Sequence, residues 1–390
     1  MFKIKTLNKI SKEGLELFPK DRYLLGTDIK DPDAILVRSA EIKFKDIPDS
    51  VLAIARAGAG YNNIPVSECT GRGIAVFNTP GGNANAVKEL VIAALILSSR
   101  DIVGGINWAR TLNVSIKPED DISVLVEKGK SKFEGSELLG KTLGVVGLGA
   151  VGALVANDAV SLGMNVIGYD PYISVDAAWS LSRSVAKAEN LESLLAKSDY
   201  ISLHLPLSED TQNSFNASKF RIMKKGSRII NMARGALVND KDIIEALSSG
   251  RLSSYVTDFP SSELLDCPRV IAIPHLGAST PEAEDNCAVM AVRQLINYLE
   301  SGAVINSVNL PQCKLEKRAP FRFAAINRNI PNMVGQITTI LADDKINILD
   351  LINHHRDNFA YNIIDTEQEL SLTTMSRLIN IDGVIRVRLI

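Results

Sequence analysis

The sequence predicts an α/β protein whose parallel sheets are followed by a small module of β-α-β-β-α-β order. Three observations support this fold class. Short apolar runs alternate with helical patterns over most of the chain, a glycine-rich loop follows one such run at Gly147, and the pattern changes after a polar stretch at residues 311–319. The alternation indicates strands of parallel sheets with helices on their faces, because parallel strands need long crossover connections.

The first part of the chain contains four strand candidates and one long helix candidate. The helix candidate covers residues 84–100, where the run "AVKELVIAALIL" is almost entirely apolar. The strand candidates are short apolar runs at residues 2–7, 34–39, 51–58 and 74–78.

After the glycine loop the same alternation continues. Asp240 is a candidate cap for one helix, Gly250 stands where that helix would end, and Pro281 falls in the first turn of another helix. Strand candidates in this part lie at residues 165–170, 200–205, 228–232, 254–259 and 270–275. The C-terminal module has strand candidates at residues 322–329, 347–357, 359–367 and 384–390, and helix candidates at residues 332–346 and 369–380.

The composition is that of an ordinary folded protein, with 46% hydrophobic and 23% charged residues. A net charge of -2 gives no basic field for nucleic acid or an anionic membrane. The longest apolar run, Leu90–Leu97, is far shorter than the ~20 residues that span a bilayer, and the N-terminal stretch lacks the apolar core of a signal peptide. The four cysteines are widely spaced. We therefore expect a cytoplasmic protein with no metal, no membrane contact and no nucleic-acid partner.

The loop "GLGAVG" places Gly147, Gly149 and Gly152 between an apolar run and a helical pattern. Such glycines permit a tight turn and close backbone approach, and the helix N-terminus then faces a dinucleotide pyrophosphate. Asp170 ends the next strand candidate, where a carboxylate would accept a hydrogen bond from the ribose 2′-hydroxyl and repel a 2′-phosphate. The pattern therefore favours NAD over NADP. Glycines that only pack a helix on a sheet are the minor alternative.

Two basic residues follow predicted strands, at the edge where an open α/β sheet binds ligands. Arg234 follows the run "RIINM", and a guanidinium suits bidentate binding of a carboxylate. His275 ends the run "VIAIPH", and imidazole is the natural base near neutral pH. Asp258 and Glu263 are the candidates for a carboxylate that orients the imidazole and stabilises its protonated form. Spacing alone does not choose between these two.

Taken in order, "GLGAVG", "YDP", "HLPL", "NMARG", "DFPSSE" and "PHLGAST" resemble the motifs of the D-2-hydroxyacid dehydrogenases, over roughly residues 1–310. The resemblance implies that Arg234, Glu263 and His275 carry catalysis, and that Asp258 holds the nicotinamide carboxamide of NAD. It also implies cofactor contacts at Ala150, Val151, Leu205, Met232, Ala233, Arg234, His275, Gly277, Ala278 and Thr79.

The stretches "ARAGAGYNNIP" and "FNTPGGNANAVKELV" resemble substrate-domain motifs of family members that act on a phosphorylated substrate. The resemblance implies that Arg56 faces the substrate phosphate, with Ala57 and Gly58 beside it, and Lys132 is a second candidate for this contact. The implied reaction is NAD-dependent oxidation of a phosphorylated D-2-hydroxy acid. The alternatives are a reductase of the same family for unphosphorylated 2-oxo acids, and a non-enzymatic NAD-sensing co-repressor on the same scaffold.

The late position of the glycine loop is explained if the cofactor domain is inserted into another domain, as the resemblance implies. We expect a flavodoxin-like substrate-binding domain, a doubly wound parallel sheet, at residues 1–98 and 284–310. A doubly wound Rossmann NAD-binding domain at residues 99–283 would interrupt it. A linker at residues 311–319 would lead to a ferredoxin-like module at residues 320–390.

The C-terminal module resembles an ACT domain, the small amino-acid-sensing unit that ends many of these enzymes. The resemblance places effector-site candidates at Asn327, Asn329 and Asn347. Asn332 stands where relatives have a glycine, and asparagine tolerates the left-handed conformation, so we expect the turn to persist. The implied partners are a small-molecule substrate, an amino-acid effector and further copies of the chain in a homodimer or homotetramer. The alternative is that the module only dimerises the chain.

Overall fold

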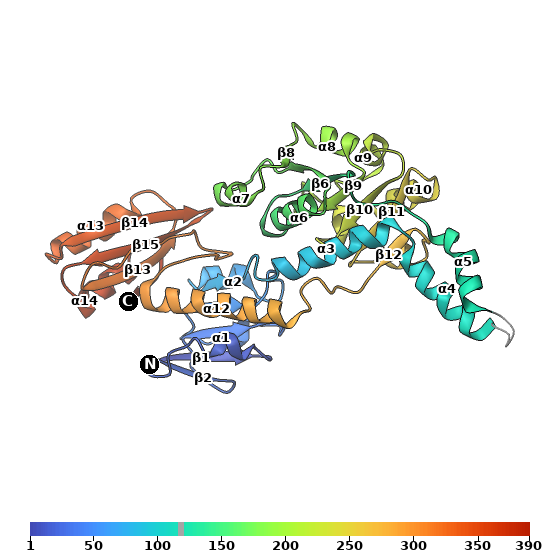
Figure 1. The fold of residues 1–390 in the computed structure, drawn as a ribbon. Helices are drawn as coiled ribbons and strands as arrows, with labels where there is room; N and C mark the ends of the chain where they lie inside the picture. The colour runs from blue at the N-terminus through green and yellow to red at the C-terminus, as the bar shows by residue number, and fades with distance from the viewer. Residues whose placement is uncertain (116–120) are drawn as a thin grey trace. The chain divides into compact units, whose positions relative to one another are not determined.

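The computed structural model describes residues 1–115 and 121–390 (Figure 1). They form two compact units: Met1–Asn83 with Pro281–Ile390, and Ala84–Thr280. The second unit is thus inserted into the first. The division falls one helix earlier than the expected boundary after residue 98, because α3 (Ala84–Ser99) packs on α6 (Ala150–Ser161) of the second unit.

The first unit contains a parallel five-stranded sheet of order β2-β1-β3-β4-β5. This is the predicted flavodoxin-like order. Its strands are β1 (Phe2–Leu7), β2 (Tyr23–Gly26), β3 (Ala34–Val37), β4 (Ala53–Arg56) and β5 (Ala75–Phe77). Leu36 and Phe77 pack into the core beneath α12 (Pro281–Ser301), while Ile35 and Val76 pack on the opposite face with Cys69 of α2 (Val66–Gly71). The short helices α1 (Lys12–Leu15) and η1 (Phe44–Asp46) complete this part.

The C-terminal module has the predicted β-α-β-β-α-β order and an antiparallel sheet of order β14-β15-β13-β16. One face of the sheet packs on its own two helices, and the other adds Ala324, Ile326, Tyr361 and Ile363 to the core beneath α12. Asn332 has a φ of 66°, which confirms the left-handed turn expected there. The elements are β13 (Phe321–Arg328), α13 (Met333–Asp343), β14 (Ile348–Arg356), β15 (Phe359–Thr366), α14 (Leu372–Ile379) and β16 (Val384–Leu389).

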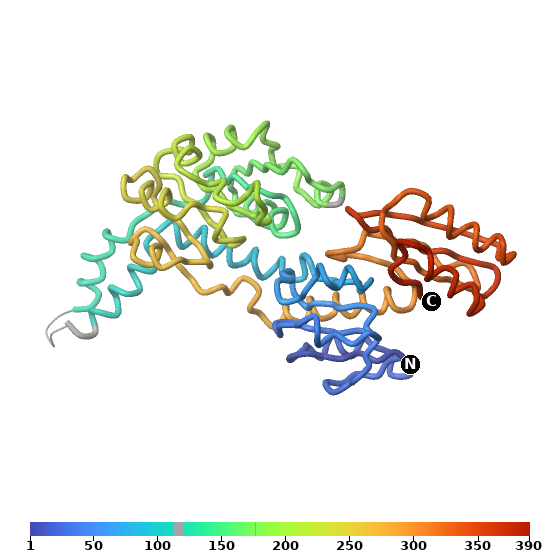
Figure 2. The backbone as a smooth tube through the Cα atoms, turned by 180° about the vertical axis from the view of Figure 1, so that it is seen from behind, coloured from blue at the N-terminus to red at the C-terminus, as the bar shows by residue number. Residues whose placement is uncertain are grey.

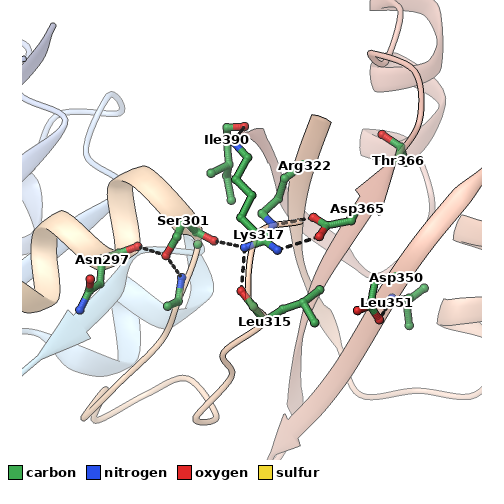
Figure 3. A network of polar contacts seen from close by, with 12 residues as sticks. Asn297, Ser301, Leu315, Lys317, Arg322, Asp350, Leu351, Asp365, Thr366 and Ile390 are labelled. Carbon is green, nitrogen blue, oxygen red and sulfur yellow. Dashed lines mark hydrogen bonds and ion pairs between the residues drawn. The ribbon is translucent and has the colours of Figure 1, made fainter. Parts of the chain in front are cut away.

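A buried arginine ties this module to the C-terminal end of α12 (Figure 3). The Arg322 and Asp365 side chains are 0% and 1% exposed, and Arg322 Nε and Nη2 lie 2.5 and 2.8 Å from the two carboxylate oxygens. Arg322 Nη1 donates to the carbonyl oxygens of Ser301, at 3.0 Å, and Leu315, at 2.9 Å. One guanidinium therefore joins a strand of the module, the end of α12 and the connecting segment.

Two further side chains of the module bind carbonyl oxygens of the same helix end. Arg388 donates to the carbonyl oxygens of Tyr298 and Leu299, and its guanidinium lies 4.2 Å from the centre of the Tyr298 ring. The hydroxyl of Tyr361 donates to the Gly302 carbonyl oxygen at 2.8 Å. The last four carbonyls of a helix have no partner within it, and Arg388 supplies a donor to that of Leu299, whereas the Tyr298 carbonyl oxygen also accepts from the Gly302 amide at 3.0 Å.

The second unit contains a parallel seven-stranded sheet of order β12-β11-β10-β9-β6-β7-β8, which is the predicted Rossmann arrangement with one added strand. The chain builds outward from β6 to β8 and then returns to the other side of β6, so the strand order reverses between β6 and β9. The strands are β6 (Thr142–Val146), β7 (Asn165–Tyr169), β8 (Val185–Lys187), β9 (Tyr200–Leu203), β10 (Ser227–Asn231), β11 (Leu252–Thr257) and β12 (Val270–Ala272).

Helices cover both faces of this sheet: α3 and α6 on one face, with α8, α9, α10 and α11 on the other. The expected cap of α10 is wrong by one residue: the Asn239 side chain caps it and accepts from the Asp242 amide, while Asp240 is the first helical residue. Short segments in this unit are η2 (Lys130–Phe133), α7 (Val175–Ser180), α8 (Leu191–Lys197), α9 (Ala217–Ile222), η3 (Gly235–Leu237), α10 (Asp240–Ser248) and α11 (Ser262–Leu265).

Two helices that the sequence did not predict, α4 (Ile102–Ser115) and α5 (Ile122–Gly129), extend away from the sheet of this unit in both views (Figures 1 and 2). Apolar side chains on both are exposed, including Ile106 at 49% and Ile122 at 57%. In the described ranges, no helix has the length and apolar character needed to cross a membrane, and no three potential ligand side chains gather around a metal position.

Candidate active site

The glycine loop lies between β6 and α6, next to the point where the strand order reverses. Gly147 has a φ of 91°, and a Cβ built there would lie 2.6 Å from the carbonyl oxygen of His204. A Cβ on Gly152 would overlap the carbonyl oxygen of Gly147. Gly149 instead faces open space: apart from its neighbours in the chain, no atom of the described residues lies within 4 Å of a built Cβ. Two glycines are thus required by close packing, and the third leaves room for a ligand.

The N-terminus of α6 is suited to hold a pyrophosphate. Gly149 is the N-cap residue and supplies no side-chain cap, so the first amides of the helix, from Ala150 and Val151 onward, have no side-chain partner at the cap. Free amides and the helix dipole together favour an anion at this position. The space over Gly149 and these amides fit the pyrophosphate of a dinucleotide.

Asp170 follows β7 and reaches back to the glycine loop. Its Oδ2 accepts from the Leu148 amide and its Oδ1 from the Tyr172 amide, both at 2.9 Å. Two backbone donors hold the carboxylate in place, and its remaining lone pairs can accept from a ribose hydroxyl. The structure thus brings together the glycines, Ala150, Val151 and Asp170, as a site for NAD requires.

His204 lies just after β9, beside the loop, and Ser202 Oγ is 2.9 Å from its Nε2. Burial lowers the pKa of His204 to about 4. Leu205 lies against the same loop, since its Cδ2 would be 3.3 Å from a Cβ on Gly147. The neutral imidazole is therefore part of the packing beneath the loop.

The pKa of His204 makes a prediction about acid stability. The unfolded chain binds a proton at this imidazole near pH 6.5, whereas the folded protein binds it only near pH 4. Stability should therefore be full above about pH 6.5 and fall as the pH drops toward about 4. In His204→Gln this loss should be smaller, by up to about 3 kcal/mol. Urea unfolding near pH 7 and near pH 4.5 measures the difference, and parallel losses in both proteins would contradict the assignment.

Arg234 is exposed and stands just beyond the end of β10. Its Nη1 donates to the Ala233 carbonyl oxygen at 2.6 Å. Met232 is buried beneath the turn, and Gly235 packs against Phe259, whose Cβ would lie 3.1 Å from a Cβ on that glycine. The guanidinium is thus presented at the carboxyl edge of the sheet, where the sequence placed it.

Asp258 and His275 lie at the same edge, beyond β11 and β12. Asp258 is only 2% exposed. Burial raises the pKa of Asp258, while the charge of His275, the backbone amides of Asp258 and Gly277 and the charge of Arg234 act to lower it. The ring of His275 lies 4.4 Å from that of Phe259, centre to centre. The structure therefore brings Arg234, Asp258 and His275 together.

Glu263 is placed differently. It lies on α11 with an exposed side chain, and its Oε2 accepts from Ser262 Oγ at 3.2 Å. Hydrogen bonds with its own backbone amide, Ser261 and Ser262 lower the pKa of Glu263. Over the described part of the chain, no hydrogen bond joins it to His275.

The other predicted residues are distributed over both units. Gly277 is buried against the Asp258 carboxylate, and Ala278 is half-buried next to it. Lys132 is exposed on η2 of the second unit. In the first unit, Arg56 ends β4 and its Nη1 donates to the Gly60 carbonyl oxygen at 2.7 Å. Ala57 and Gly58 follow it in the chain, and the amide of the buried Thr79 donates to the Gly58 carbonyl oxygen at 3.1 Å.

The three effector candidates of the C-terminal module do not form one site. Asn327 is 1% exposed, and its Oδ1 accepts from Asn362 Nδ2 at 2.7 Å within the sheet. Asn329 and Asn347 are on the surface, where their amides donate to the carbonyl oxygen of Asp357 and to the Glu367 carboxylate, at 3.3 and 3.2 Å. An exposed effector contact is therefore open to Asn329 and Asn347 but not to Asn327.

Asn231, the buried last residue of β10, was not among the site residues predicted from the sequence. Its side chain contacts the backbone of Arg234, three residues later. Its position could have indicated a role, because in "NMARG" it is a polar residue that follows an apolar run and precedes Arg234.

Comparison with known proteins identifies the family. Residues 95–277 match the NAD-binding domain of the D-isomer-specific 2-hydroxyacid dehydrogenases. The chain is 34% identical over 336 residues to D-3-phosphoglycerate dehydrogenase of Methanocaldococcus jannaschii, covering 83% of this chain and 60% of that protein. It is 30% identical over 346 residues to a putative D-3-phosphoglycerate dehydrogenase of Schizosaccharomyces pombe, covering 81% and 69%. The chain thus spans less than two thirds of the length of the first of these relatives.

A solved structure agrees with these matches. The NAD⁺-bound 3-phosphoglycerate dehydrogenase of Entamoeba histolytica superposes with a TM-score of 0.61 at 28% identity, over 79% of this chain and 98% of that one. The resemblance drawn from the ordered motifs is confirmed, and so is a domain for NAD. The chain belongs to the D-isomer-specific 2-hydroxyacid dehydrogenase family.

Proposed function

We propose that the protein oxidises D-3-phosphoglycerate to 3-phosphohydroxypyruvate with NAD, the first step of phosphorylated serine biosynthesis. The observation that supports this most directly is the grouping of Arg234, Asp258 and His275 at the carboxyl edge of the sheet that carries the dinucleotide loop. Relatives at 30 to 34% identity that bear this enzyme's name support the choice of substrate.

The proposed roles follow from the chemistry of each group. Arg234 binds the substrate carboxylate and polarises the C2 oxygen. His275 takes the proton of the C2 hydroxyl as the C2 hydrogen leaves with its electron pair. Bound NAD supplies the acceptor for that hydride. Asp258 has a buried carboxylate beside His275 and Arg234. By its resemblance to the family, we propose that this carboxylate binds the carboxamide of the nicotinamide. Glu263 is proposed, on the same ground, to stabilise the imidazolium.

Arg56 is proposed to bind the substrate phosphate. An Arg56→Ala variant should lose about tenfold or more in kcat/KM for 3-phosphohydroxypyruvate, because a charge-assisted hydrogen bond to phosphate contributes about 1.5–3 kcal/mol. Its activity on hydroxypyruvate should change little, since that substrate has no phosphate. NADH oxidation with both substrates, and with glyoxylate and 2-oxoglutarate, measures this.

The same assay decides between the alternatives. A parent protein that prefers hydroxypyruvate or glyoxylate would support the reductase. A parent that binds NADH but turns over none of the four oxo acids would support the co-repressor.

We also propose an assembly surface and an effector site. The exposed apolar side chains of α4 and α5 offer a surface for a second copy of the chain, in a homodimer or homotetramer whose mass light scattering would give. Asn329 and Asn347 offer amides to an amino-acid effector, which equilibrium binding of serine to the full chain would detect.

A further inference from the structure

The turn that presents Arg234 is held from inside the protein by one side chain. Asn231 Oδ1 accepts from the amides of Ala233, at 3.2 Å, and Arg234, at 3.4 Å. Asn231 Nδ2 donates to the Arg234 carbonyl oxygen at 2.9 Å and to the Tyr255 hydroxyl oxygen at 3.1 Å. The amide and the carbonyl group of Arg234 are therefore bound by the two ends of a single carboxamide.

This clamp is deeply buried. Asn231 and Tyr255 are each 0% exposed, so water does not replace a lost hydrogen bond without rearrangement. Burial raises the pKa of Tyr255 to about 12, and its hydroxyl stays protonated at neutral pH. Asn231 is itself fixed by β10, where it pairs with Leu203 of β9 and Thr257 of β11. The carboxamide is thus anchored at the end of a strand that is paired on both sides.

The side chain of Arg234, in contrast, is exposed, and within the described residues it is bound near its own backbone. Its Nη1 contacts the Ala233 carbonyl oxygen, one residue away. The direction in which the guanidinium points thus depends on the conformation of its backbone. Arg234 has an extended backbone, with φ of -151° and ψ of 133°, directly before the turn η3.

We infer that Asn231 is a positioning residue for Arg234, and that its carboxamide fixes the backbone from which the guanidinium reaches the substrate carboxylate. This rests on the proposed function, in which Arg234 clamps a 2-oxo or 2-hydroxy acid. Asn231 itself touches no substrate. Its contribution is the alignment of the clamp, which a displacement of about 1 Å can degrade by about 10²-fold in rate.

The test uses the full chain and three variants: Asn231→Ala, Arg234→Ala and the double variant. Asn231→Ala should lower kcat/KM for the oxo acid by about 100-fold, divided between a higher KM and a lower kcat, because the carboxylate is held in both the ground and transition states. NADH affinity, measured by fluorescence, should stay within about twofold. In the Arg234→Ala background, Asn231→Ala should cost less than about threefold, since it acts only through the arginine.

A matched control separates positioning from general stability. Asn309 is another buried asparagine: its Nδ2 donates to Thr70 Oγ1 and the Ile74 carbonyl oxygen, and its Oδ1 accepts from the Val76 amide. Asn309→Ala should lower the melting temperature as Asn231→Ala does and leave KM unchanged.

Asn231→Asp covers the case in which the alanine variant fails to fold. It retains the acceptor for the two amides and loses the donor, so its effect should be intermediate, at about tenfold. An unchanged KM in Asn231→Ala or Asn231→Asp, or full additivity with Arg234→Ala, would overturn the inference while the parent remained active. A parent that turned over no oxo acid would overturn the proposed function, and the inference with it.

Discussion

Replacing His275 by alanine is expected to lower kcat/KM by about 10³-fold, within the range of about 10² to 10⁴ that a positioned acid–base group contributes. The imidazole is the proposed acceptor of the C2 hydroxyl proton, and alanine leaves that proton to water. NADH binding should fall far less than turnover, because the glycine loop and Asp170, which hold the rest of the cofactor, lie at a different part of the sheet edge. Steady-state kinetics with 3-phosphohydroxypyruvate and NADH provide the measurement.

His354 offers a control for this experiment. It is an exposed histidine on β14 of the first unit, and its Nδ1 contacts the Gln312 carbonyl oxygen at 2.6 Å. His354→Ala should retain the activity of the parent. Turnover of His275→Ala within about threefold of the parent would show that another group accepts the proton. Asp258→Asn and Glu263→Gln, compared in pH–rate profiles, then show which carboxylate acts on His275.

Replacing Arg322 by alanine is expected to destabilise the first unit by about 3–5 kcal/mol. The variant leaves the Asp365 carboxylate, which is 1% exposed, without its bidentate partner, and it leaves the carbonyl oxygens of Ser301 and Leu315 without a donor. A buried charge that loses its partner carries the full cost of its desolvation. Urea unfolding of the full chain, followed by fluorescence, should show the loss.

Two comparisons make this result specific. Arg318→Ala removes an exposed ion pair with Glu316, whose side chains are 80% and 74% exposed, and should cost less than about 0.5 kcal/mol. The double variant Arg322→Met/Asp365→Leu removes both charges and should recover at least half of the loss. A single Arg322→Ala variant as stable as Arg318→Ala would contradict the importance of the buried pair.

Periodicity in the sequence was enough to predict most of the strands and the three sheet types, but two of the edge strands were missed. β2 (Tyr23–Gly26) and β8 (Val185–Lys187) were missed because each is short and lies at a sheet edge, where half of the burial that creates an apolar run is absent. The helices α4 and α5 were missed for a related reason, since their apolar residues include exposed ones such as Ile106.

The site residues divide in the same way. Arg234 and His275 could be predicted because residues just beyond parallel strands meet at one edge of the sheet. Which of Asp258 and Glu263 lies beside His275 could not be predicted, because the distance along the chain does not say which carboxylate is buried. Asn327 shows the opposite limit: a motif position suggested an effector contact, whereas its strand lies between β15 and β16 and its side chain is buried.

The capping of α12 by side chains of the C-terminal module bears on how such a chain can evolve. Arg322 and Arg388 donate to carbonyl oxygens at the end of the helix, and Tyr361 donates to that of Gly302, the next residue. The core beneath the helix is completed by apolar residues of the module. If recombination replaced this module by one from another protein, the new module would have to supply equivalent hydrogen-bond donors. Otherwise the carbonyl oxygens at the end of α12 would lose these partners. The module and α12 are therefore expected to be inherited together rather than shuffled as separate parts.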